Sequence, residues 1–450
     1  MTTAALPTIR HLVPGTVKAG IEELGGRPAM VARSVSVRRR GALSSDDGAT
    51  MEAAATDALS LRIPLVLVIA SSGADVSEGM DSLHGWGRAA RAIARCSGTV
   101  PVVAVVTGPA ISGPALLLGI ADVVIMTSEA FAFVSGPAMV QEFTGVRIGI
   151  HQLGGAAMHS RSSGLCAVEA ASESHAMEHV DNLLSYLPAH TDEVTPRGPR
   201  HDPADRPHPE LREIIPARAT SSYDVRHVAA ALADDGDVTE LWGRWSPQLV
   251  TAVGRIDGRS VGFLANQPQA LAGTLDIAAS QKGARFVRFC DAFNLPLVTL
   301  VDTPGFLPGK DLEWRGMIRH GAELAFAYAE ATVPRVCVIL RKAFGGAYIV
   351  MDSRGLGNDL CFAWPCAEIA VMGAEGAVQI LYRNSTVEER AGLQADYSEA
   401  FLTPWQAAER GFVDAVIDPA DTRATVARAL GALESSREHL PGRKHTIGPL

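Results

Sequence analysis

Two halves of the chain repeat one pattern of apolar runs and glycine turns. The first half contains LRIPLVLVIASSGADVSEG and GTVPVVAVVTGPAISGPALLLG, and the second contains FNLPLVTLVDTPGFLPG and ATVPRVCVILRKAFGGAYIVM. Pro64 and Pro101 lie 37 positions apart, and Pro296 and Pro334 lie 38 positions apart. This agreement in order, spacing and residue type predicts a tandem duplication, because self-similarity of this kind indicates repeated structural units.

The apolar runs within each half have the character of buried strands. They are continuous, follow a proline and precede glycine or serine, as is typical of strands covered on both faces. Helix-like segments such as GMDSLHGWGRAARAIARC separate them. Strand and helix in alternation favour βαβ units, largely parallel sheet and right-handed connections. We therefore predict an α/β protein made of two related domains.

A polar, proline-rich stretch at residues 190–216 lies between the halves. Its scarcity of apolar side chains is typical of a surface linker. We expect a domain at 1–190, a linker at 191–215 and a second domain at 216–450. The segment VRHVAAALADDGDVTELW is predicted to be helical, and Asp257-Gly258 is predicted to turn a β-hairpin.

The composition excludes several classes of protein. The net charge of −9 and the aromatic content of 6% do not resemble a nucleic-acid binder. None of the six cysteines forms a Cys-x-x-Cys pair, so no zinc ribbon is predicted. No apolar run reaches the roughly 18 residues that a membrane span requires. We expect a cytoplasmic protein with no metal site, no membrane segment and no nucleic-acid partner.

The glycine turns are candidates for catalysis. In both halves the glycine lies 12 positions after the second proline of the repeat. Backbone N–H groups at the start of a helix lack intrachain partners, and two of them aimed at one oxygen form an oxyanion hole. The candidate donors are Gly346 and Ala347 in the second half, and Ser112 and Gly113 in the first. The alternative is that these turns only allow close backbone packing.

Motifs of the second half point to a family. VDTPGFLPG, VPRVCVILRKAFGGAYIVM and FAWPCAEIAVMGAEGAVQILYR occur in this order at fitting spacings. Together they resemble the carboxyltransferase (β) subunit of biotin-dependent acyl-CoA carboxylases, the acetyl- and propionyl-CoA carboxylase β chains. The resemblance extends from about Gly25 to the C-terminus. It implies two crotonase-like (ClpP/crotonase) domains with a ββα superhelix.

The resemblance also implies a reaction and partners. Carboxybiotin on a separate carrier subunit would give its carboxyl group to the α-carbon of a short acyl-CoA such as acetyl-, propionyl- or butyryl-CoA. The partners would be biotin carboxylase and the biotin carboxyl carrier subunit, and no metal would bind this chain. A homo-hexamer is expected, with active sites where the N-domain of one subunit meets the C-domain of another. Much of the rate enhancement would come from positioning the two reactants.

Individual residues acquire roles through the same resemblance. Gly346 and Ala347 match the C-domain donor pair on the biotin side, and Ser112 and Gly113 match the N-domain pair on the acyl-CoA side. Ile349 falls where the family tunes acyl-chain choice, or it packs in the core. The residues expected to bind substrate or cofactor are Gly345, Tyr348, Ile349, Phe344, Gly41, Ala42, Gly73 and Ala74.

The first half departs from the family pattern near the expected CoA site. Ser72 and Asp75 replace a glycine and an arginine of an Asp-Ser-Gly-Gly-Ala-Arg motif. In RRRGALS, Arg40 and Ser44 replace glycines of the Gly-Gly-x-x-Gly turn. Pro114 stands where the family has alanine, and proline has no amide to donate.

These departures leave two alternative functions open. One is a non-catalytic β-type subunit that pairs with an active paralogue. The other is a decarboxylase or carboxylase of an unusual acyl thioester in a specialised pathway.

Three further features have two interpretations each. Arg38-Arg39-Arg40 either contact CoA phosphates or form a solvated basic run. His159 is either a catalytic base or a histidine that fastens a loop. The segment DTPGF at 302–306 contains Asp-x-x-Gly, but no Gly-x-x-x-x-Gly-Lys-Ser/Thr precedes it, so a GTPase is not predicted.

Overall fold

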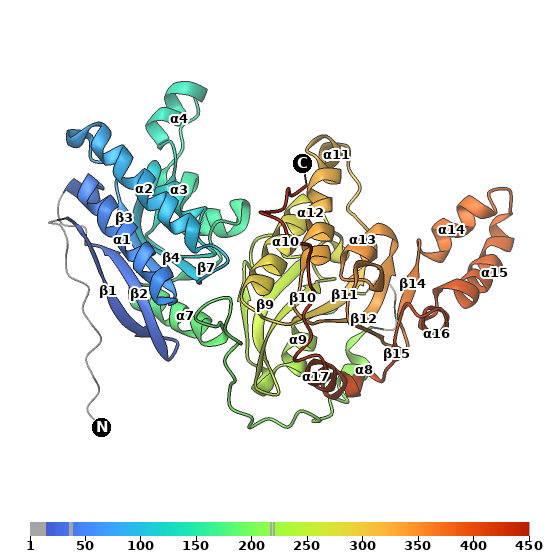
Figure 1. Cartoon of the computed structure of the whole chain (residues 1–450). Coiled ribbons are helices and arrows are strands. Elements are labelled where there is room, and N and C mark those ends of the chain that lie inside the picture. The colour runs from blue at the N-terminus through green and yellow to red at the C-terminus, as the bar shows by residue number, and fades with distance from the viewer. Residues whose placement is uncertain (1–14, 36–38, 217, 219–220, 450) are drawn as a thin grey trace. The chain divides into compact units, whose positions relative to one another are not determined.

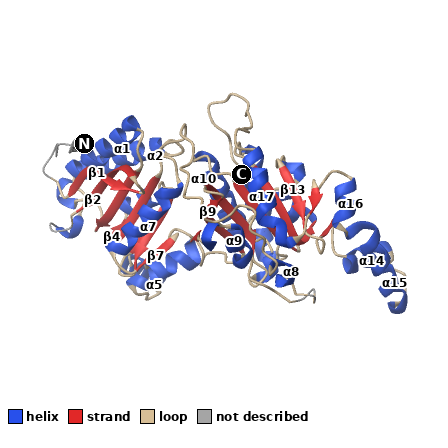
Figure 2. Ribbon diagram, turned by 90° about the horizontal axis from the view of Figure 1, so that it is seen from below, coloured by secondary structure: helices blue, strands red, loops and turns tan. Residues whose placement is uncertain are grey.

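The computed structural model describes residues 15–35, 39–216, 218 and 221–449. The described chain divides into two units, each with its own sheet and helices (Figures 1 and 2). We call residues up to 196, with 242–245 and 292–294, the N-unit. Residues 197–241, 246–291 and 295 onward form the C-unit.

The N-unit is built on a seven-stranded sheet in the order β1-β2-β3-β4-β5-β7, with β6 paired to β4. Only the β1–β2 pair is antiparallel, and the other pairs are parallel. The strands are β1 (Val17–Leu24), β2 (Arg27–Ser34), β3 (Leu65–Ser71), β4 (Val102–Ile111), β5 (Val123–Thr127), β6 (Phe131–Phe133) and β7 (Val168–Ala170).

Alanine-rich helices cover this sheet. Met51 and Ala55 of α1, Ile93 of α2 and Leu67 of β3 are buried in one hydrophobic cluster, so both helices pack on the same core. The helices are α1 (Ser45–Leu61), α2 (Met80–Cys96), α3 (Gly113–Leu118), α4 (Pro137–Thr144), α5 (Ile150–Gly154), α6 (Ala156–Met158) and α7 (Glu173–Tyr186).

The C-unit repeats this plan with an eight-stranded sheet in the order β15-β13-β12-β11-β10-β9-β8, and β14 pairs with β12. The pairs β8–β9 and β9–β10 are antiparallel, and the others are parallel. The strands are β8 (Val238–Leu241), β9 (Leu249–Ile256), β10 (Arg259–Asn266), β11 (Leu297–Thr303), β12 (Arg335–Phe344), β13 (Leu360–Ala363), β14 (Glu368–Ala370) and β15 (Ala415–Val416).

The helices of the C-unit are α8 (Leu211–Ile214), α9 (Arg226–Leu232), α10 (Ile277–Ala292), α11 (Lys310–Trp314), α12 (Met317–Glu330), α13 (Gly345–Val350), α14 (Ala374–Leu381), α15 (Val387–Tyr397), α16 (Pro404–Glu409) and α17 (Thr422–Ala432). Most of them lie beside the sheet, whereas α14 and α15 extend away from it (Figures 1 and 2). No helix in the described ranges combines the length and the apolar character that a bilayer-spanning segment needs.

The tandem duplication is confirmed in the strand registers. The amide of Leu65 donates to the Pro101 carbonyl (2.8 Å), and the amide of Leu297 donates to the Pro334 carbonyl (2.9 Å). The register then shifts once near the end of each pair, between Ile69 and Ser71 in β3 and between Val301 and Thr303 in β11. The two halves therefore share pairing and irregularity as well as sequence spacing.

Two local predictions have different outcomes. The hairpin is confirmed, because Arg259 pairs with Ile256 across Asp257 and Gly258, both of which have positive φ. The helix predicted for residues 225–242 is wrong in its second part. Helix α9 ends at Leu232, and Val238–Leu241 forms the edge strand β8, where pairing with β9 outweighs the local helical preference.

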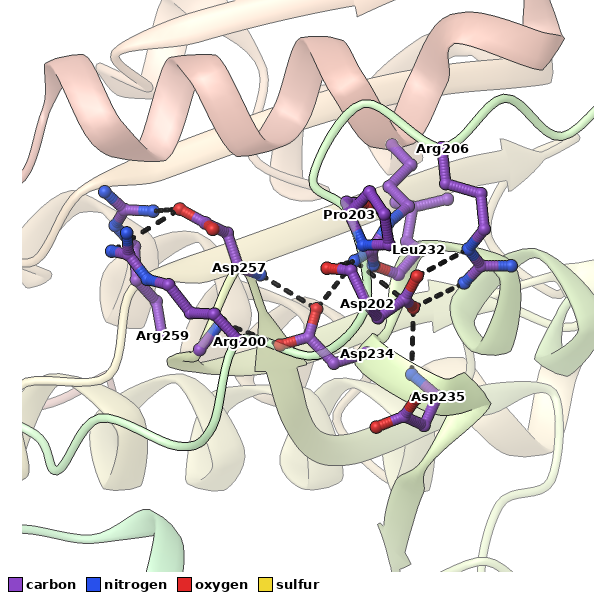
Figure 3. A network of polar contacts seen from close by, with 11 residues as sticks. Arg200, Asp202, Pro203, Arg206, Leu232, Asp234, Asp235, Asp257 and Arg259 are labelled. Atoms are coloured by element: carbon purple, nitrogen blue, oxygen red, sulfur yellow. Dashed lines mark hydrogen bonds and ion pairs between the residues drawn. The ribbon is translucent and has the colours of Figure 1, made fainter.

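A charged network within the C-unit holds the segment that begins at residue 197 to the rest of that unit (Figure 3). Asp202 accepts two hydrogen bonds of 2.6 Å from the Arg206 guanidinium. The buried Arg423 guanidinium pairs with Asp202 at 3.3 Å and with Asp234 at 2.7 Å. Asp234 in turn accepts the amide of Asp257 at the hairpin turn (2.9 Å). Part of the expected linker is thus held by ion pairs that leave Arg423 fully compensated.

Candidate active site

The glycine turn of the C-unit repeat joins β12 to α13 (Figure 1). Strand β14 pairs with the end of β12, with Phe344 opposite Ala370, and fixes where the strand stops. Gly345 then adopts a φ of 58°, in the left-handed region that favours glycine. A Cβ at this position would also lie 3.0 Å from the Val371 carbonyl oxygen. Gly345 is therefore required both by its dihedral angle and by its neighbour.

The amides that follow this bend belong to the first turn of α13. Phe344 is the N-cap and provides no side-chain hydrogen bond. The amides of Gly345, Gly346 and Ala347 therefore precede the first intrahelical hydrogen bond. Amides in these positions have no acceptor within the helix, so they are the donors that this terminus can offer to a ligand.

A cavity of about 530 Å³ opens at this helix terminus. Its lining combines backbone of the turn with apolar and aromatic side chains and two arginines. The lining residues are Gly345, Gly346, Tyr348, Ile349, Ser353, Arg354, Gly355, Ile369, Ala370, Val371, Tyr397, Phe401, Gln406, Ala407, Arg410 and Phe412.

The cavity brings together most of the residues predicted in the second half. Gly345, Gly346, Tyr348 and Ile349 line it. Ile349 is 44% exposed, so its side chain faces the cavity more than the core. Phe344 and Ala347 are buried and do not line it.

Tyr348 has the smallest exposed fraction of the four predicted residues that line the cavity. Burial raises the pKa of its phenol above the ordinary value, which keeps the hydroxyl protonated and able to donate.

The sequence did not predict the cavity residues that come from the segment around α15 and α16. Tyr397 and Phe401 come from the end of α15 and the turn after it, with ring centroids 5.0 Å apart. Phe412 and Arg410 follow α16. The one local signal was the aromatic pair at i, i+4, which faces one side of a helix but does not say what lies opposite.

The segment DTPGF at 302–306 stabilises the end of β12, next to the turn into α13. The buried carboxylate of Asp302 accepts from the Arg341 guanidinium at 3.0 Å and from the Lys342 amide at 3.1 Å. Burial raises the pKa of Asp302, and the Arg341 charge opposes that rise. These contacts fasten the end of β11 to the end of β12, which is a structural role and agrees with the exclusion of a GTPase.

The corresponding turn of the N-unit joins β4 to α3. Ser112 adopts a φ of 61°, almost the value of Gly345, although it carries a side chain. Its amide donates to the Phe133 carbonyl at 3.0 Å. Pro114 has no amide, and the Ala115 amide donates to the Ser112 carbonyl at 3.1 Å, so the amide of Gly113 is the remaining donor of this turn. The donor pair predicted at Ser112 and Gly113 is thereby reduced to Gly113.

Two predicted CoA-facing turns of the N-unit lie side by side. Leu43, which follows Gly41 and Ala42, forms a bridge with Ala74. The amide of Leu43 donates to the Gly73 carbonyl at 2.8 Å. The four predicted residues Gly41, Ala42, Gly73 and Ala74 thus come together.

Three departures from the family pattern have local structural roles. Ser44 caps α1 with a capping box. Asp75 caps the short helix at 76–78. Arg40 adopts a left-handed φ of 54°.

His159 fastens a loop. Its Nε2 donates to the Ala132 carbonyl at 2.8 Å, so Nδ1 is left to accept from the Ser163 hydroxyl at 2.7 Å. Burial lowers the pKa of this imidazole, which favours the neutral ring. Both nitrogens are engaged within the N-unit, and a role as catalytic base has no support.

Two other expectations concern features that the structure covers only in part. Arg38 lies outside the described residues, so the proposed basic run is not seen as a whole. Across the described chain, no group of three or more His, Cys, Asp or Glu side chains is placed to hold a metal ion.

Comparison with known proteins gives a consistent result. The family described as "Carboxyl transferase domain" matches residues 2–447. The propionyl-CoA carboxylase beta chain of Roseobacter denitrificans is 43% identical over 390 residues, which are 86% of this chain and 76% of that protein. The methylmalonyl-CoA decarboxylase subunit alpha of Veillonella parvula is 41% identical over 394 residues, which are 87% and 77%.

A solved structure shares the fold over nearly the whole chain. The transcarboxylase 12S hexamer, with methylmalonyl-coenzyme A and methylmalonic acid bound, superposes with a TM-score of 0.95 at 42% identity. The match covers 97% of this chain and 85% of that one. The expected crotonase-like, two-domain α/β fold is confirmed by this similarity.

Proposed function

The chain belongs to the carboxyl transferase family, and from this premise we propose that it transfers a carboxyl group from carboxybiotin on a separate carrier protein to the α-carbon of a short acyl-CoA. The observation that carries the proposal is the cavity at the first turn of α13, where Gly345 and Gly346 present backbone to a ligand. Paired donors of this kind stabilise charge that develops on an oxygen during acyl and carboxyl transfer.

The lining of the cavity supports a role in binding the biotin ring system. Biotin is a compact bicycle with apolar flanks and one polar ureido group. Ile369, Phe401 and Phe412 offer apolar surface, and the amides of α13 offer donors at one end. Carboxybiotin would supply the carboxyl group when bound. The amides of Gly346 and Ala347 would donate to its ureido oxygen.

The protein contributes positioning and fixed dipoles. The turn cannot shift easily, because Asp302 accepts the Lys342 amide and β14 pairs with the end of β12. Donors held in this way need no reorganisation when charge develops, which is the main source of electrostatic catalysis. The buried phenol of Tyr348 stays neutral and adds a further donor to the wall.

On the acyl-CoA side we retain Gly113 as the donor to the thioester oxygen. Ser112 is no longer proposed, since its amide already donates to Phe133. The paired turns with Gly41, Ala42, Gly73 and Ala74 are proposed to contact the acyl-CoA, because their backbone segments lie together. Ile349 is proposed to limit acyl-chain length from its half-exposed position in the cavity.

We also propose that the chain works as a homo-hexamer together with biotin carboxylase and a biotin carboxyl carrier subunit. The hexamer described for the transcarboxylase 12S neighbour supports this assembly. The carboxylase partners follow from the similarity to propionyl-CoA carboxylase beta chains.

A second candidate function is decarboxylation of a malonyl-type thioester. The 41% identity to a methylmalonyl-CoA decarboxylase subunit favours it. Either reaction requires a stabilised thioester enolate, so the same backbone donors would serve both.

The discriminating experiment mixes the purified chain with a biotin carboxylase, a biotinylated carrier, ATP and bicarbonate, and offers acetyl-, propionyl- or butyryl-CoA. Formation of a carboxylated acyl-CoA that depends on the carrier supports the proposal. Carbon dioxide release from methylmalonyl- or malonyl-CoA, without carboxylation of any acyl-CoA, would identify the second candidate. Carrier binding without turnover of any thioester would contradict both.

A further inference from the structure

Trp86 lies over the glycine turn of the N-unit. It belongs to α2, and a Cβ built on Gly113 would lie 2.7 Å from its Cε2 and 2.8 Å from its Nε1. The pyrrole edge of the indole, which carries the N–H, is therefore the part that approaches the turn. Any residue larger than glycine at position 113 would collide with it.

The indole N–H of Trp86 has no acceptor within the described ranges, although its nitrogen is buried. Buried donors in proteins are seldom left without a partner, so each exception calls for an explanation. Trp86 is itself only partly buried, and Ser112 beside it is exposed, so the turn can be approached from solvent. An acceptor that arrives with a ligand would account for the unpartnered N–H.

The corresponding glycine of the C-unit, Gly346, has a different aromatic neighbour. There the aromatic side chain nearest the glycine is Phe306, whose Cε2 would lie 3.7 Å from a Cβ on Gly346. Phenylalanine has no N–H, but the next residue, Ala347, has an amide. In the N-unit the next residue is Pro114, which has none, and the aromatic side chain is a tryptophan. Each turn thus has two potential donors, drawn from different groups.

We propose that the indole N–H of Trp86 is the second hydrogen-bond donor of the N-unit turn and acts with the amide of Gly113 on the thioester oxygen of the acyl-CoA. The indole N–H would supply the second donor, because Pro114 has no backbone N–H. This inference rests on the proposed function and deepens it, because it assigns the acyl-CoA side a donor pair of mixed origin.

The test removes the indole N–H at position 86 and then restores a hydrogen-bond donor at position 114. Trp86→Phe keeps an aromatic ring over the turn but removes the N–H. It is expected to lower kcat for acyl-CoA carboxylation by on the order of 10²-fold, the usual effect of losing one oxyanion donor. Pro114→Ala returns an amide to the turn. The double variant Trp86→Phe/Pro114→Ala is expected to recover most of the lost rate.

Two readouts separate a donor from a residue that only packs. The Trp86→Phe variant is expected to weaken binding of acyl-CoA while leaving the affinity for free CoA, which has no thioester oxygen, unchanged. Its thermal midpoint and its oligomeric state are expected to match the wild type. If the phenylalanine variant does not fold, benzothienylalanine at position 86, which has sulfur in place of the N–H, is used instead.

The outcomes are distinct. A rate within about threefold of the wild type in the folded variant lacking the N–H would overturn the inference and leave the proposed function intact. Equal weakening of acyl-CoA and free CoA, or no recovery in the double variant, would also overturn it. A wild-type chain that carboxylates no acyl-CoA in the complete assay would instead contradict the proposed function itself.

Discussion

The two glycine turns share a positive φ at equivalent positions but expose different donors. Gly345 and Ser112 occupy equivalent positions, with φ of 58° and 61°. In the C-unit the turn opens into a cavity, and Gly345, Gly346 and Ala347 each carry an amide that precedes the first intrahelical hydrogen bond of α13. In the N-unit the Ser112 amide is already bonded, Pro114 has no amide, and Trp86 covers Gly113.

This comparison shows which features of the duplicated unit stay the same in both halves and which differ. The register of the strands and the sign of φ are fixed by the sheet, since a change in either would disturb the whole ladder. The chemical groups at the turn are fixed only by the ligand. Divergence of Ser112 and Pro114 from glycine and alanine leaves the fold intact and agrees with the proposal that the two units bind different ligands.

The largest effect is expected when the C-unit turn is given the N-unit residue. Ala347→Pro removes one amide at a position where the N-unit accommodates proline. Carboxylation should fall by about 10²–10³-fold, because one oxyanion donor is lost. Steady-state kinetics with the complete carboxylase system measure this, and thermal unfolding serves as the control. A folded variant with nearly wild-type rate would show that this amide does not act on the substrate.

The second-largest effect is expected in the stability of variants at the two glycines, Gly113 and Gly346. Gly113→Ala places a Cβ 2.7 Å from Trp86 Cε2 and is expected to lower the free energy of unfolding by about 1–3 kcal/mol, as overpacking does. Gly346→Ala has 3.7 Å to Phe306, which is ordinary contact, so its stability should be unchanged or higher by up to about 1 kcal/mol. Urea unfolding of the two variants compares them directly. Equal destabilisation would argue against the described placement of Trp86.

The smallest effect on stability is expected at Ser112, whose φ lies in the left-handed region. Ser112→Gly relieves a side chain from a positive φ and should raise the free energy of unfolding by about 1 kcal/mol. The matched change Gly345→Ser places a side chain at a φ of 58° and should destabilise the fold by a similar amount or more. Chemical denaturation of both variants tests this pair. A destabilised Ser112→Gly would mean that the serine hydroxyl makes a contact worth more than the strain.

The sequence predicted the fold more completely than the site. Strands that follow Pro64, Pro101, Pro296 and Pro334 were predictable, because continuous apolar runs with fixed spacing have few alternatives. The edge strand β8 was not, since Val238–Leu241 lacks an apolar run and its strand state depends on β9. Residue-level motifs also located Gly345 and Gly346, which line the cavity.

The rest of the site could not be predicted for a physical reason. Tyr397, Phe401 and Phe412 reach the cavity only through tertiary packing of α15 and α16. The engagement of the Ser112 amide depends on Phe133, and the donor of Trp86 depends on how α2 packs on α3. Contacts of this kind carry no signature in local sequence, because their partners are distant along the chain.

The central claim is that a bare backbone amide at the start of α13 acts on the reacting groups. It is tested most directly by comparing Gly346→Pro, which removes the amide, with Gly346→Ala, which keeps it, in the complete carboxylation assay. Both changes add side-chain atoms at the same cavity wall, so the difference between them isolates the N–H. We predict that the proline variant loses about 10²–10³-fold in rate relative to the alanine variant while both remain folded. Equal rates in the two variants would contradict the account.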